Sequence, residues 1–501
     1  MNDKKKLLLR NTYSSLIFQI TTIVCGFILP RAILGAFGSE VNGLVQSISQ
    51  FLSIISFLEL GVGAVIQSSL YKPLAEKNNI LTSQIIASGQ KFFTRIGQIL
   101  LVYIIFLMIV YPYIANQNFG FLYTSALIGA ISISYFSQYY FGVVDRLLLT
   151  ADQHGYIQYN AQTITLVLNT ISCLILIKLG ASIHLVKLTT SLIYLVRPIY
   201  LRMYVNHHYQ LDRKIKYTGE PIKQKWNGIA QHVAAVILDQ TDIIVLTLLS
   251  TLSNVSIYSV YSFVVIGVKQ LFMSMTNGIQ ALEGEYYSEN NKDELKGMFL
   301  LSEWAIHSGT VLIFTCTEIL IVPFVTVYTM GIHDANYYQP LFAALLTLAN
   351  AGHCLRLPYN IMILAAGHYK QTQSNYIIAA VMNIVISIIL VKKLGLIGVA
   401  IGTLIAMFYQ TIWMSVYCSR NLVYTPYGST IKQFLTDIIT TCIIILSCRW
   451  IHIEMSSYFT WVIMALIVFL IALAITIIIN WLLYRENISY FIRQFTHKGN
   501  K

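Results

Sequence analysis

Hydrophobic residues in this sequence occur in long runs separated by short polar segments. A window of about 19 residues, the length suited to a membrane-crossing helix, finds fourteen such runs. They cover residues 14–36, 41–66, 96–116, 120–143, 157–178, 183–203, 228–250, 255–279, 299–327, 339–365, 373–391, 396–417, 434–452 and 458–484. Backbone polar groups cannot face lipid unpaired, so apolar runs of this length predict helices. The pattern predicts an all-α polytopic membrane protein with about fourteen transmembrane helices.

Composition supports this fold class. Of the 501 residues, 56% are hydrophobic and 11% are charged, whereas soluble domains have about 45–50% apolar and about 25% charged residues. A soluble globular protein is therefore excluded. Each span needs about 20 apolar residues, so fourteen spans use nearly all of the apolar content. Little of the chain remains for a separate catalytic domain.

The basic residues define an orientation. With the N-terminus inside, the inner loops and tails hold 24 of the Lys and Arg residues and the outer loops hold 4. This excess follows the positive-inside rule, so we place both termini in the cytoplasm. The net charge of +12 is then explained by the cytoplasmic loops, and no nucleic-acid partner is expected.

A basic inner loop between the sixth and seventh runs divides the chain. We expect an N-terminal six-helix lobe over residues 1–203, a cytoplasmic basic linker over 204–227 and a C-terminal six-helix lobe over 228–417. Two additional transmembrane helices over 434–484 and a cytoplasmic tail over 485–501 complete the chain.

A weak internal repeat supports this division. A shift of 215 residues aligns LLTADQHGYIQYN (148–160) with ILAAGHYKQTQSN (363–375), and IKLG with KKLG. The two lobes then form a parallel repeat, an arrangement in which transporters place the substrate site between the halves.

Motifs that carry enzymatic chemistry are absent from the sequence. There is no GxxxxGK[ST] phosphate loop, HExxH or GxSxG. The seven cysteines are scattered and form no metal-ligand spacing. We therefore expect no catalytic residues, no metal site and no cofactor, and conclude that the protein is not an enzyme.

Ionisable residues within the apolar runs are the candidate functional groups, because charges in a membrane are costly and usually face a cavity. Asp239 and Asp242 share one helix face near mid-depth. They could bind a coupling ion or a proton, pair with a cation, or form a structural interhelix hydrogen bond. In the next run Lys269 and Gln270 precede Asn277, which lies on the same face as Gln270.

Other intramembrane charges have two interpretations each. Arg356 either lines a cationic cavity with Lys269 or extends to the inner interface. Arg31 and Arg197 lie near span ends, so they either face the lumen or reach the interface, and Lys187 is expected to reach the outer surface. In the second run Glu59 is deep and is a candidate polar group of the lumen.

The segment GFILPRAILGAFGSEVNGLVQSISQFLSIISFLELGVGAV (26–65) resembles the opening helices of bacterial polysaccharide transporters. These are lipid-linked oligosaccharide flippases of the multidrug/oligosaccharidyl-lipid/polysaccharide exporter (MOP) superfamily. The segments LLTADQHGY, TDIIVL and ILAAGHYKQ also fit, and the resemblance extends over all fourteen spans.

The resemblance implies a multi-pass protein of the bacterial cytoplasmic (inner) membrane. It implies translocation of an undecaprenyl-pyrophosphate-linked oligosaccharide by alternating access through a cationic inter-lobe cavity, for capsule, exopolysaccharide or O-antigen biosynthesis. Arg31, Arg197, Lys269 and Arg356 would then meet the polyprenyl pyrophosphate and its acidic sugars. The lipid bilayer, a polysaccharide polymerase and glycosyltransferases are the partners implied.

Two alternatives remain at this point. A cation-coupled multidrug or toxic-compound antiporter of the same superfamily fits Asp239 and Asp242, but predicts twelve spans and an acidic cavity. A membrane glycan polymerase would need a substantial outward loop, and the longest one here is only TMGIHDANYYQ.

Overall fold

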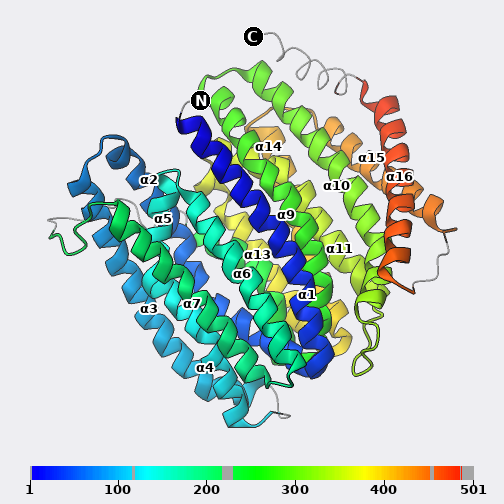
Figure 1. The fold of residues 1–501 in the computed structure, drawn as a ribbon. Coiled ribbons are helices and arrows are strands. Elements are labelled where there is room, and N and C mark those ends of the chain that lie inside the picture. Colours follow the sequence, from blue (N-terminus) through cyan, green and yellow to red (C-terminus); the bar gives the residue numbers. More distant parts are fainter. Residues whose placement is uncertain (1–2, 116–118, 217–228, 452–455, 486, 488–501) are drawn as a thin grey trace. The chain divides into compact units, whose positions relative to one another are not determined.

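The computed structural model contains helices and no β-strand over the residues that it describes, which are 3–115, 119–216, 229–451, 456–485 and 487. Within these ranges the side chains of residues 57–61, 239 and 277, among others, are not described. The chain forms two compact units (Figure 1). Unit 1 comprises Met1–Val236 and Thr251–Ser256, and unit 2 comprises Ile237–Ser250 and Ile257–Lys501.

Unit 1 is built from the first helices of the chain. They are α1 (Asp3–Ser53), α2 (Ser56–Ala75), α3 (Asn79–Ala115), α4 (Phe121–Ser137), the π-helical turn η1 (Gln138–Gly142), α5 (Val143–Ala151), α6 (Gly155–Lys178) and α7 (Ile183–His208). The helix α1 packs along α6, α4 packs along α7, and α2 packs along α5. Their inward faces form one hydrophobic core, whose fully buried members include Leu52, Phe93 and Leu148.

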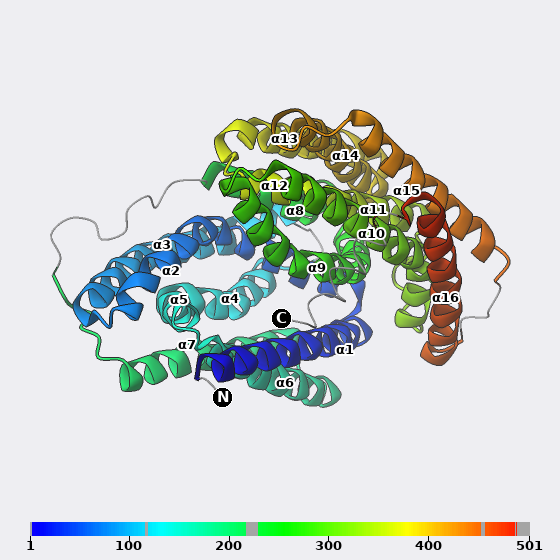
Figure 2. The same cartoon turned by 90° about the horizontal axis from the view of Figure 1, so that it is seen from above.

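Two helices, α8 (Ile229–Leu249) and α9 (Leu252–Ser288), contribute residues to both units. The remaining helices belong to unit 2. They are α10 (Lys292–Tyr328), α11 (Pro340–Leu355), α12 (Leu357–Ala365), α13 (Tyr369–Leu394), α14 (Leu396–Asn421), α15 (Tyr427–Cys448) and α16 (Tyr458–Leu483). Within unit 2, α13 packs along α14, α14 along α11, and α15 and α16 along α10 (Figures 1 and 2). A separate small core around Val468 and Ile444 holds α15 and α16 against α10.

The all-α fold class predicted from the sequence is confirmed, although several helix boundaries differ. The run 41–66 is divided at residues 54–55, between α1 and α2. The break of α1 at Gly38, whose φ of 82° suits only glycine, falls in the predicted gap between runs 14–36 and 41–66. The run 339–365 is divided at Arg356, two residues before Pro358, which lacks an N–H and restricts the backbone before it. The prediction of single helices over these two runs was wrong.

Hydropathy also placed the start of α3 too late. The helix begins at Asn79, whereas the apolar run begins at residue 96. The additional turns are amphipathic, and they bury Ile85, Ile86 and Phe93 in the core of unit 1. A hydropathy window detects the stretch that can lie in lipid, but it does not detect the amphipathic extension of the same helix.

Ten helices among the described residues are long and apolar enough to cross a membrane. Four expected spans are missing from these ten, each for a local reason. Two of them, 41–66 and 339–365, are broken. The third, 183–203, corresponds to α7, which carries Lys187, Arg197 and Arg202. The fourth begins at residue 228, outside the described residues, and its apolar part here is the shorter Gln240–Leu249.

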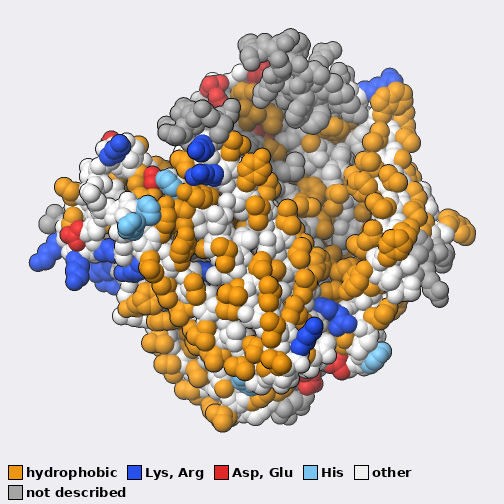
Figure 3. Space-filling model, in the orientation of Figure 1, with side chains coloured by type: hydrophobic (Ala, Val, Ile, Leu, Met, Phe, Trp, Pro, Cys, Tyr) orange, Lys and Arg blue, Asp and Glu red, His pale blue; other side chains and the backbone are white. Residues whose placement is uncertain are grey.

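The outward faces of unit 1 suit a lipid environment. Large hydrophobic side chains are exposed along α6 and α7, including Ile164, Ile171, Leu192 and Met203. Figure 3 shows hydrophobic side chains over much of the surface formed by these helices. Contiguous apolar surface of this extent marks contact with a membrane or a partner, and the helices span lengths suited to a bilayer.

The segment ADQHG between α5 and α6 is fixed by polar contacts. The Tyr209 hydroxyl donates to Asp152 Oδ2 at 2.6 Å, and His154 Nδ1 lies 3.2 Å from the same oxygen. Burial opposes ionisation of Asp152, but these two contacts outweigh it and hold the pKa of the carboxyl below its usual value. The hydrogen bond to Asp152 in turn raises the pKa of His154. The side chain of Asn11 joins α1 to this segment by donating to the Gln153 carbonyl oxygen at 2.6 Å.

Close approach of α13 and α14 generates a stability prediction. A Cβ at Gly398 would lie 2.6 Å from the carbonyl carbon of Leu390, a backbone atom that cannot move aside. We expect Gly398→Ala to lower the apparent Tm in detergent by a few degrees, because overpacking costs about 1–3 kcal/mol. The control Gly129→Ala meets only a methionine methyl at 3.7 Å and should leave Tm unchanged or higher. Equal melting of both variants would contradict the close packing.

Candidate functional site

Unit 1 contains a partly open cavity of about 360 Å³ between α1, α4, η1, α5, α6 and α7. Arg146, Lys187 and Arg197 line it, and none of the described lining residues is an aspartate or glutamate. The remaining polar lining consists of hydroxyl and amide groups from Ser49, Ser134, Tyr135, Gln138, Gln158, Gln162, Thr190, Ser191 and Tyr194. The cavity therefore presents three cations and many neutral hydrogen-bonding groups, a combination suited to an anion with polar substituents.

The backbone of α4, η1 and α7 shapes this cavity. Residues 138–142 form a π-helical turn, a local widening of the helix that often occurs at functional sites. Its last residue, Gly142, lets α7 approach, since a Cβ there would lie 2.8 Å from Pro198 Cβ. Gln138, Gly142 and Pro198 all line the cavity.

Arg197 is held in place by neighbours on α6 and α7. Its Nε donates to Thr165 Oγ1 at 2.5 Å, and one Nη donates to the Gln162 carbonyl oxygen at 3.4 Å. The guanidinium carbon also lies 3.8 Å from the centroid of the Tyr194 ring, a cation–π contact. A guanidinium has five N–H donors, so these contacts orient the group and leave donors for a ligand. The structure thus places one sequence-predicted binding residue in a cavity.

Lys187 was predicted to reach the outer surface, and this prediction was wrong. The side chain lines the same cavity as Arg197, and no described residue forms a hydrogen bond or ion pair with its ammonium group. The signal was present in the sequence, because Lys187, Thr190, Tyr194 and Arg197 follow the three-to-four-residue spacing of one helical face. Depth along the span indicates the outer surface, whereas the helical face of the side chain indicates the cavity.

The other candidates in unit 1 lie elsewhere. Arg31 is on α1 and half-buried, and it is not among the described residues that line the cavity. Glu59 is on α2, and its side chain lies outside the described part of the structure. Arg146 was not predicted as a site residue, because it follows the apolar run 120–143 and was counted with the next loop.

In unit 2, Lys269 and Arg356 are both buried, with 8% and 6% of their surfaces exposed. Arg356 occupies the break between α11 and α12, where it donates to Gln410 Oε1 and lies 3.3 Å from His353 Nδ1. Its guanidinium is also 5.9 Å from the Tyr376 ring centroid. Lys269 and Arg356 both act electrostatically on His353, so the two predicted cations belong to one buried region.

Asp242 belongs to a second polar cluster of unit 2. Its Oδ2 accepts from the Tyr258 hydroxyl and from Thr403 Oγ1, both at 2.8 Å. Asn383 extends this cluster by donating to Thr403 Oγ1 at 2.9 Å. The hydrogen-bonded role considered for Asp242 is present, and binding of a coupling ion stays a prediction. The side chains of Asp239 and Asn277 lie outside the described residues, and Gln270 is exposed.

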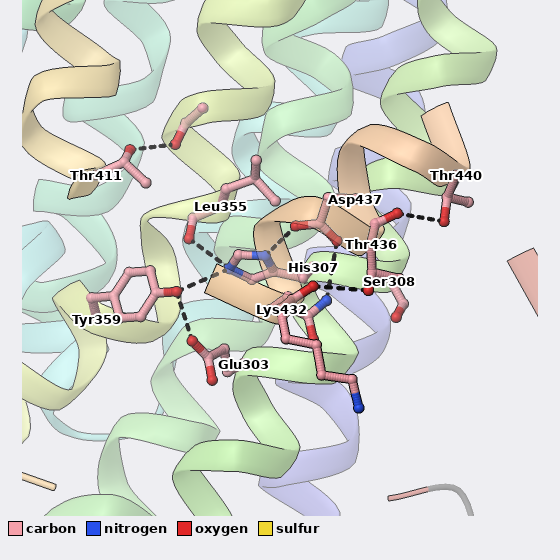
Figure 4. A network of polar contacts seen from close by, with 12 residues as sticks. Glu303, His307, Ser308, Leu355, Tyr359, Thr411, Lys432, Thr436, Asp437 and Thr440 are labelled. Atoms are coloured by element: carbon pink, nitrogen blue, oxygen red, sulfur yellow. Dashed lines mark hydrogen bonds and ion pairs between the residues drawn. The ribbon is translucent and has the colours of Figure 1, made fainter. Parts of the chain in front are cut away.

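A third cluster in unit 2 was missed by the sequence analysis. Glu303 and His307 on α10, Tyr359 on α12 and Asp437 on α15 form a buried hydrogen-bonded chain (Figure 4). Glu303 and His307 are four residues apart within one apolar run, so they share a helix face. That spacing could have identified them, but Asp437 lies 130 positions further along the chain than His307, and no local pattern connects the two.

The fold resembles known membrane-transport structures. No protein-family model matches the chain, and none of the curated proteins matches it by sequence. Among solved structures, the lipid II flippase MurJ in an inward closed conformation has a TM-score of 0.72 and 14% identity, covering 95% of this chain and 99% of that chain.

Two multidrug transporters are also similar. An inward-facing MATE family transporter of the MOP superfamily has a TM-score of 0.62 and 15% identity, covering 80% of this chain and 94% of its own. A mutant of the Vibrio cholerae MATE transporter VcmN has a TM-score of 0.60 and 12% identity, with coverages of 84% and 98%. The chain therefore has the fold of MOP-superfamily transporters.

The charge of the unit 1 cavity predicts selective access. A cysteine introduced at Ser134, which lines the cavity, should react faster with an anionic methanethiosulfonate reagent than with a cationic one, by about tenfold or more, because an uncompensated charge attracts strongly at low dielectric. Adding Lys187→Gln and Arg197→Gln should reduce this ratio. Leu192→Cys, on the exposed apolar face of α7, is the control and should react slowly with both reagents. A ratio that the two neutralisations leave unchanged would contradict a cationic cavity.

Proposed function

We propose that this protein is a flippase for a polyprenyl-diphosphate-linked oligosaccharide in a cytoplasmic membrane, with both termini in the cytoplasm. The observation that carries the proposal is the cavity of unit 1, which has three cations and no described carboxylate in its lining. The substrate's diphosphate is the anion for this cavity, and its hydroxylated sugars match the surrounding amide and hydroxyl groups.

The physical problem in such transport is the polar head group. A diphosphate and several sugars cannot cross hydrocarbon unaided, because each unsatisfied polar group costs several kcal/mol there. Fixed cations and hydrogen-bonding groups substitute for the lost hydration. At an effective dielectric constant of about 20, two opposite unit charges about 4 Å apart attract by about 4 kcal/mol. The polyprenyl tail remains in lipid while the head is held by the protein.

The cavity volume limits what enters it. At about 360 Å³ it lies near the lower end of the usual range for ligand pockets, about 300–1,000 Å³. We therefore assign it to the diphosphate end of the substrate rather than to a whole oligosaccharide. Arg197, Lys187 and Arg146 would contact the phosphates there, and Arg31, Lys269 and Arg356 are proposed to act at other stages of alternating access.

The similar structures support this class of substrate over the multidrug alternative. The match to the lipid II flippase covers 95% of this chain, whereas the two MATE matches cover 80% and 84%. A flippase also suits the two additional helices α15 and α16, since the antiporter alternative predicts twelve spans. An antiporter for cationic drugs would further require an acidic cavity, and the described cavity is basic.

Neutralising the cavity should stop export. We expect Arg197→Gln or Lys187→Gln to reduce the surface glycan of the native bacterium by about tenfold or more, because hydrogen bonds to charged groups contribute about 1.5–3 kcal/mol. The lipid-linked precursor should accumulate in the inner leaflet.

The control is Lys178→Gln, which removes a positive charge from the exposed end of α6 without touching the cavity. It should export normally at equal protein level. Normal surface glycan in both cavity variants, or resistance to cationic drugs that depends on the protein, would contradict the flippase assignment and favour the antiporter.

A further inference from the structure

Three ionisable side chains lie together in the interior of unit 2 (Figure 4), and no described Lys or Arg side chain forms a hydrogen bond or ion pair with them. His307 has 0% of its surface exposed, Glu303 has 3%, and Asp437 has 6%. Tyr359, also fully buried, connects Glu303 to the histidine. Ionisable groups buried in membrane-spanning helices are costly and are usually functional, which makes this cluster a candidate for a role of its own.

The contacts of the His307 ring indicate how many protons the His307–Asp437 pair holds. Nε2 lies 3.1 Å from the backbone oxygen of Leu355, which can only accept, so Nε2 carries a hydrogen. Nδ1 lies 2.6 Å from Asp437 Oδ2, and a lone pair on nitrogen facing a carboxylate would be repelled. A second proton must therefore lie between His307 and Asp437, either on the imidazolium or on the carboxyl group.

Loss of that second proton changes the contacts around it. A neutral ring with its hydrogen on Nδ1 keeps the bond to Asp437 but loses the bond to Leu355. Its Nε2 can then accept from the Tyr359 hydroxyl, which lies 3.5 Å away and in this structure donates to Glu303 Oε1 at 2.7 Å. One proton thus determines whether His307 Nε2 donates to Leu355 or accepts from Tyr359.

The Leu355 carbonyl connects this change to the backbone. Leu355 is the last residue of α11, and Arg356 forms the break before α12. With two protons on the His307–Asp437 pair, His307 Nε2 donates to the Leu355 carbonyl and connects α10 to that break, and loss of one proton removes this hydrogen bond. Arg356, the next residue, is one of the proposed substrate contacts. The peptide group whose oxygen accepts from His307 therefore also carries a proposed substrate-binding cation.

Other titratable groups surround the cluster and influence when the proton leaves. Glu283 on α9 accepts from Ser302 at 3.0 Å, and the Cys418 thiol on α14 donates to the Tyr359 carbonyl at 3.3 Å. Asp437 also accepts from Gln433 at 3.0 Å. The remaining charged or titratable neighbours, from α11–α12, α15 and α16, are His353, Arg356, Lys432 and Tyr484. The acidic groups favour retention of the proton, and the basic ones favour its release.

We propose that Glu303, His307, Tyr359 and Asp437 form a proton-binding site that takes up and releases one proton during transport. The proton thereby controls the hydrogen bond between His307 and the α11–α12 break. The inference concerns the driving ion and holds for either class of substrate. The simplest alternative is that the His307–Asp437 contact permanently holds α15 against α10 and that His307 does not change its protonation.

The test is nitrogen NMR of histidine in the full chain, labelled with ¹⁵N in its imidazole rings and reconstituted in lipid nanodiscs. We expect the imidazole signals of His307, identified by their loss in His307→Gln, to show both ring nitrogens protonated at low pH and to lose one proton in a single step between about pH 5 and about pH 9. Backbone hydrogen exchange over residues 355–360 should accelerate through the same step. His307→Gln should abolish both signals.

The matched control is His184→Gln. His184 also places Nε2 on a backbone oxygen, that of Tyr123 at 2.8 Å, but it lies in unit 1, and its removal should leave both signals intact. If His307→Gln does not fold, Asp437→Asn replaces it and should move the step to lower pH, because the neighbouring negative charge is lost.

A His307 ring whose protonation is constant over this range, or a step without a change in exchange at 355–360, would overturn the proposal. The readout needs no substrate. A protein that titrates as expected but does not export glycan contradicts only the flippase assignment, and one that exports glycan without titrating contradicts only the proton site.

Discussion

The cost of placing charge inside a bilayer is the constraint on which the rest of this structure depends. A charged side chain at mid-membrane costs at least about 2.5 kcal/mol even on the most permissive scale, so each one needs a compensating environment. In unit 1, three cations line a cavity with many neutral polar groups. In unit 2, buried ionisable groups have hydrogen-bond partners within the protein, as Asp242 has in Tyr258 and Thr403.

These two solutions have different consequences. A buried group whose partners are all supplied by the protein mainly fixes the packing of helices. A cation whose N–H donors are not all used within the protein is available to bind a ligand of opposite charge. Lys187, with no described ion-pair partner, and Arg197, oriented by Thr165 and Tyr194, are of the second kind. The His307–Asp437 pair combines both features, because its partners come from the protein and we propose that it also binds and releases a proton.

The helices could largely be predicted from the sequence because lipid permits few backbone conformations. Breaks within the predicted runs were harder, since those at residues 54–55 and at Arg356 lie in apolar sequence that hydropathy treats as continuous. Arg197 was identified as a site residue because it is a cation in an apolar run. The partners of His307 could not be found in this way, because Leu355 and Asp437 reach it through packing of α11 and α15 on α10 rather than through spacing along the chain.

The most direct measurement compares equilibrium binding of undecaprenyl diphosphate and uncharged undecaprenol to the purified full chain in nanodiscs. The account predicts at least about tenfold tighter binding of the diphosphate, equivalent to about 1.4 kcal/mol. It also predicts that this preference weakens with salt and is lost in the double variant Lys187→Gln, Arg197→Gln. Equal affinity for the two lipids, or an unchanged preference in the double variant, would contradict the claim that the unit 1 cavity holds the anionic head group.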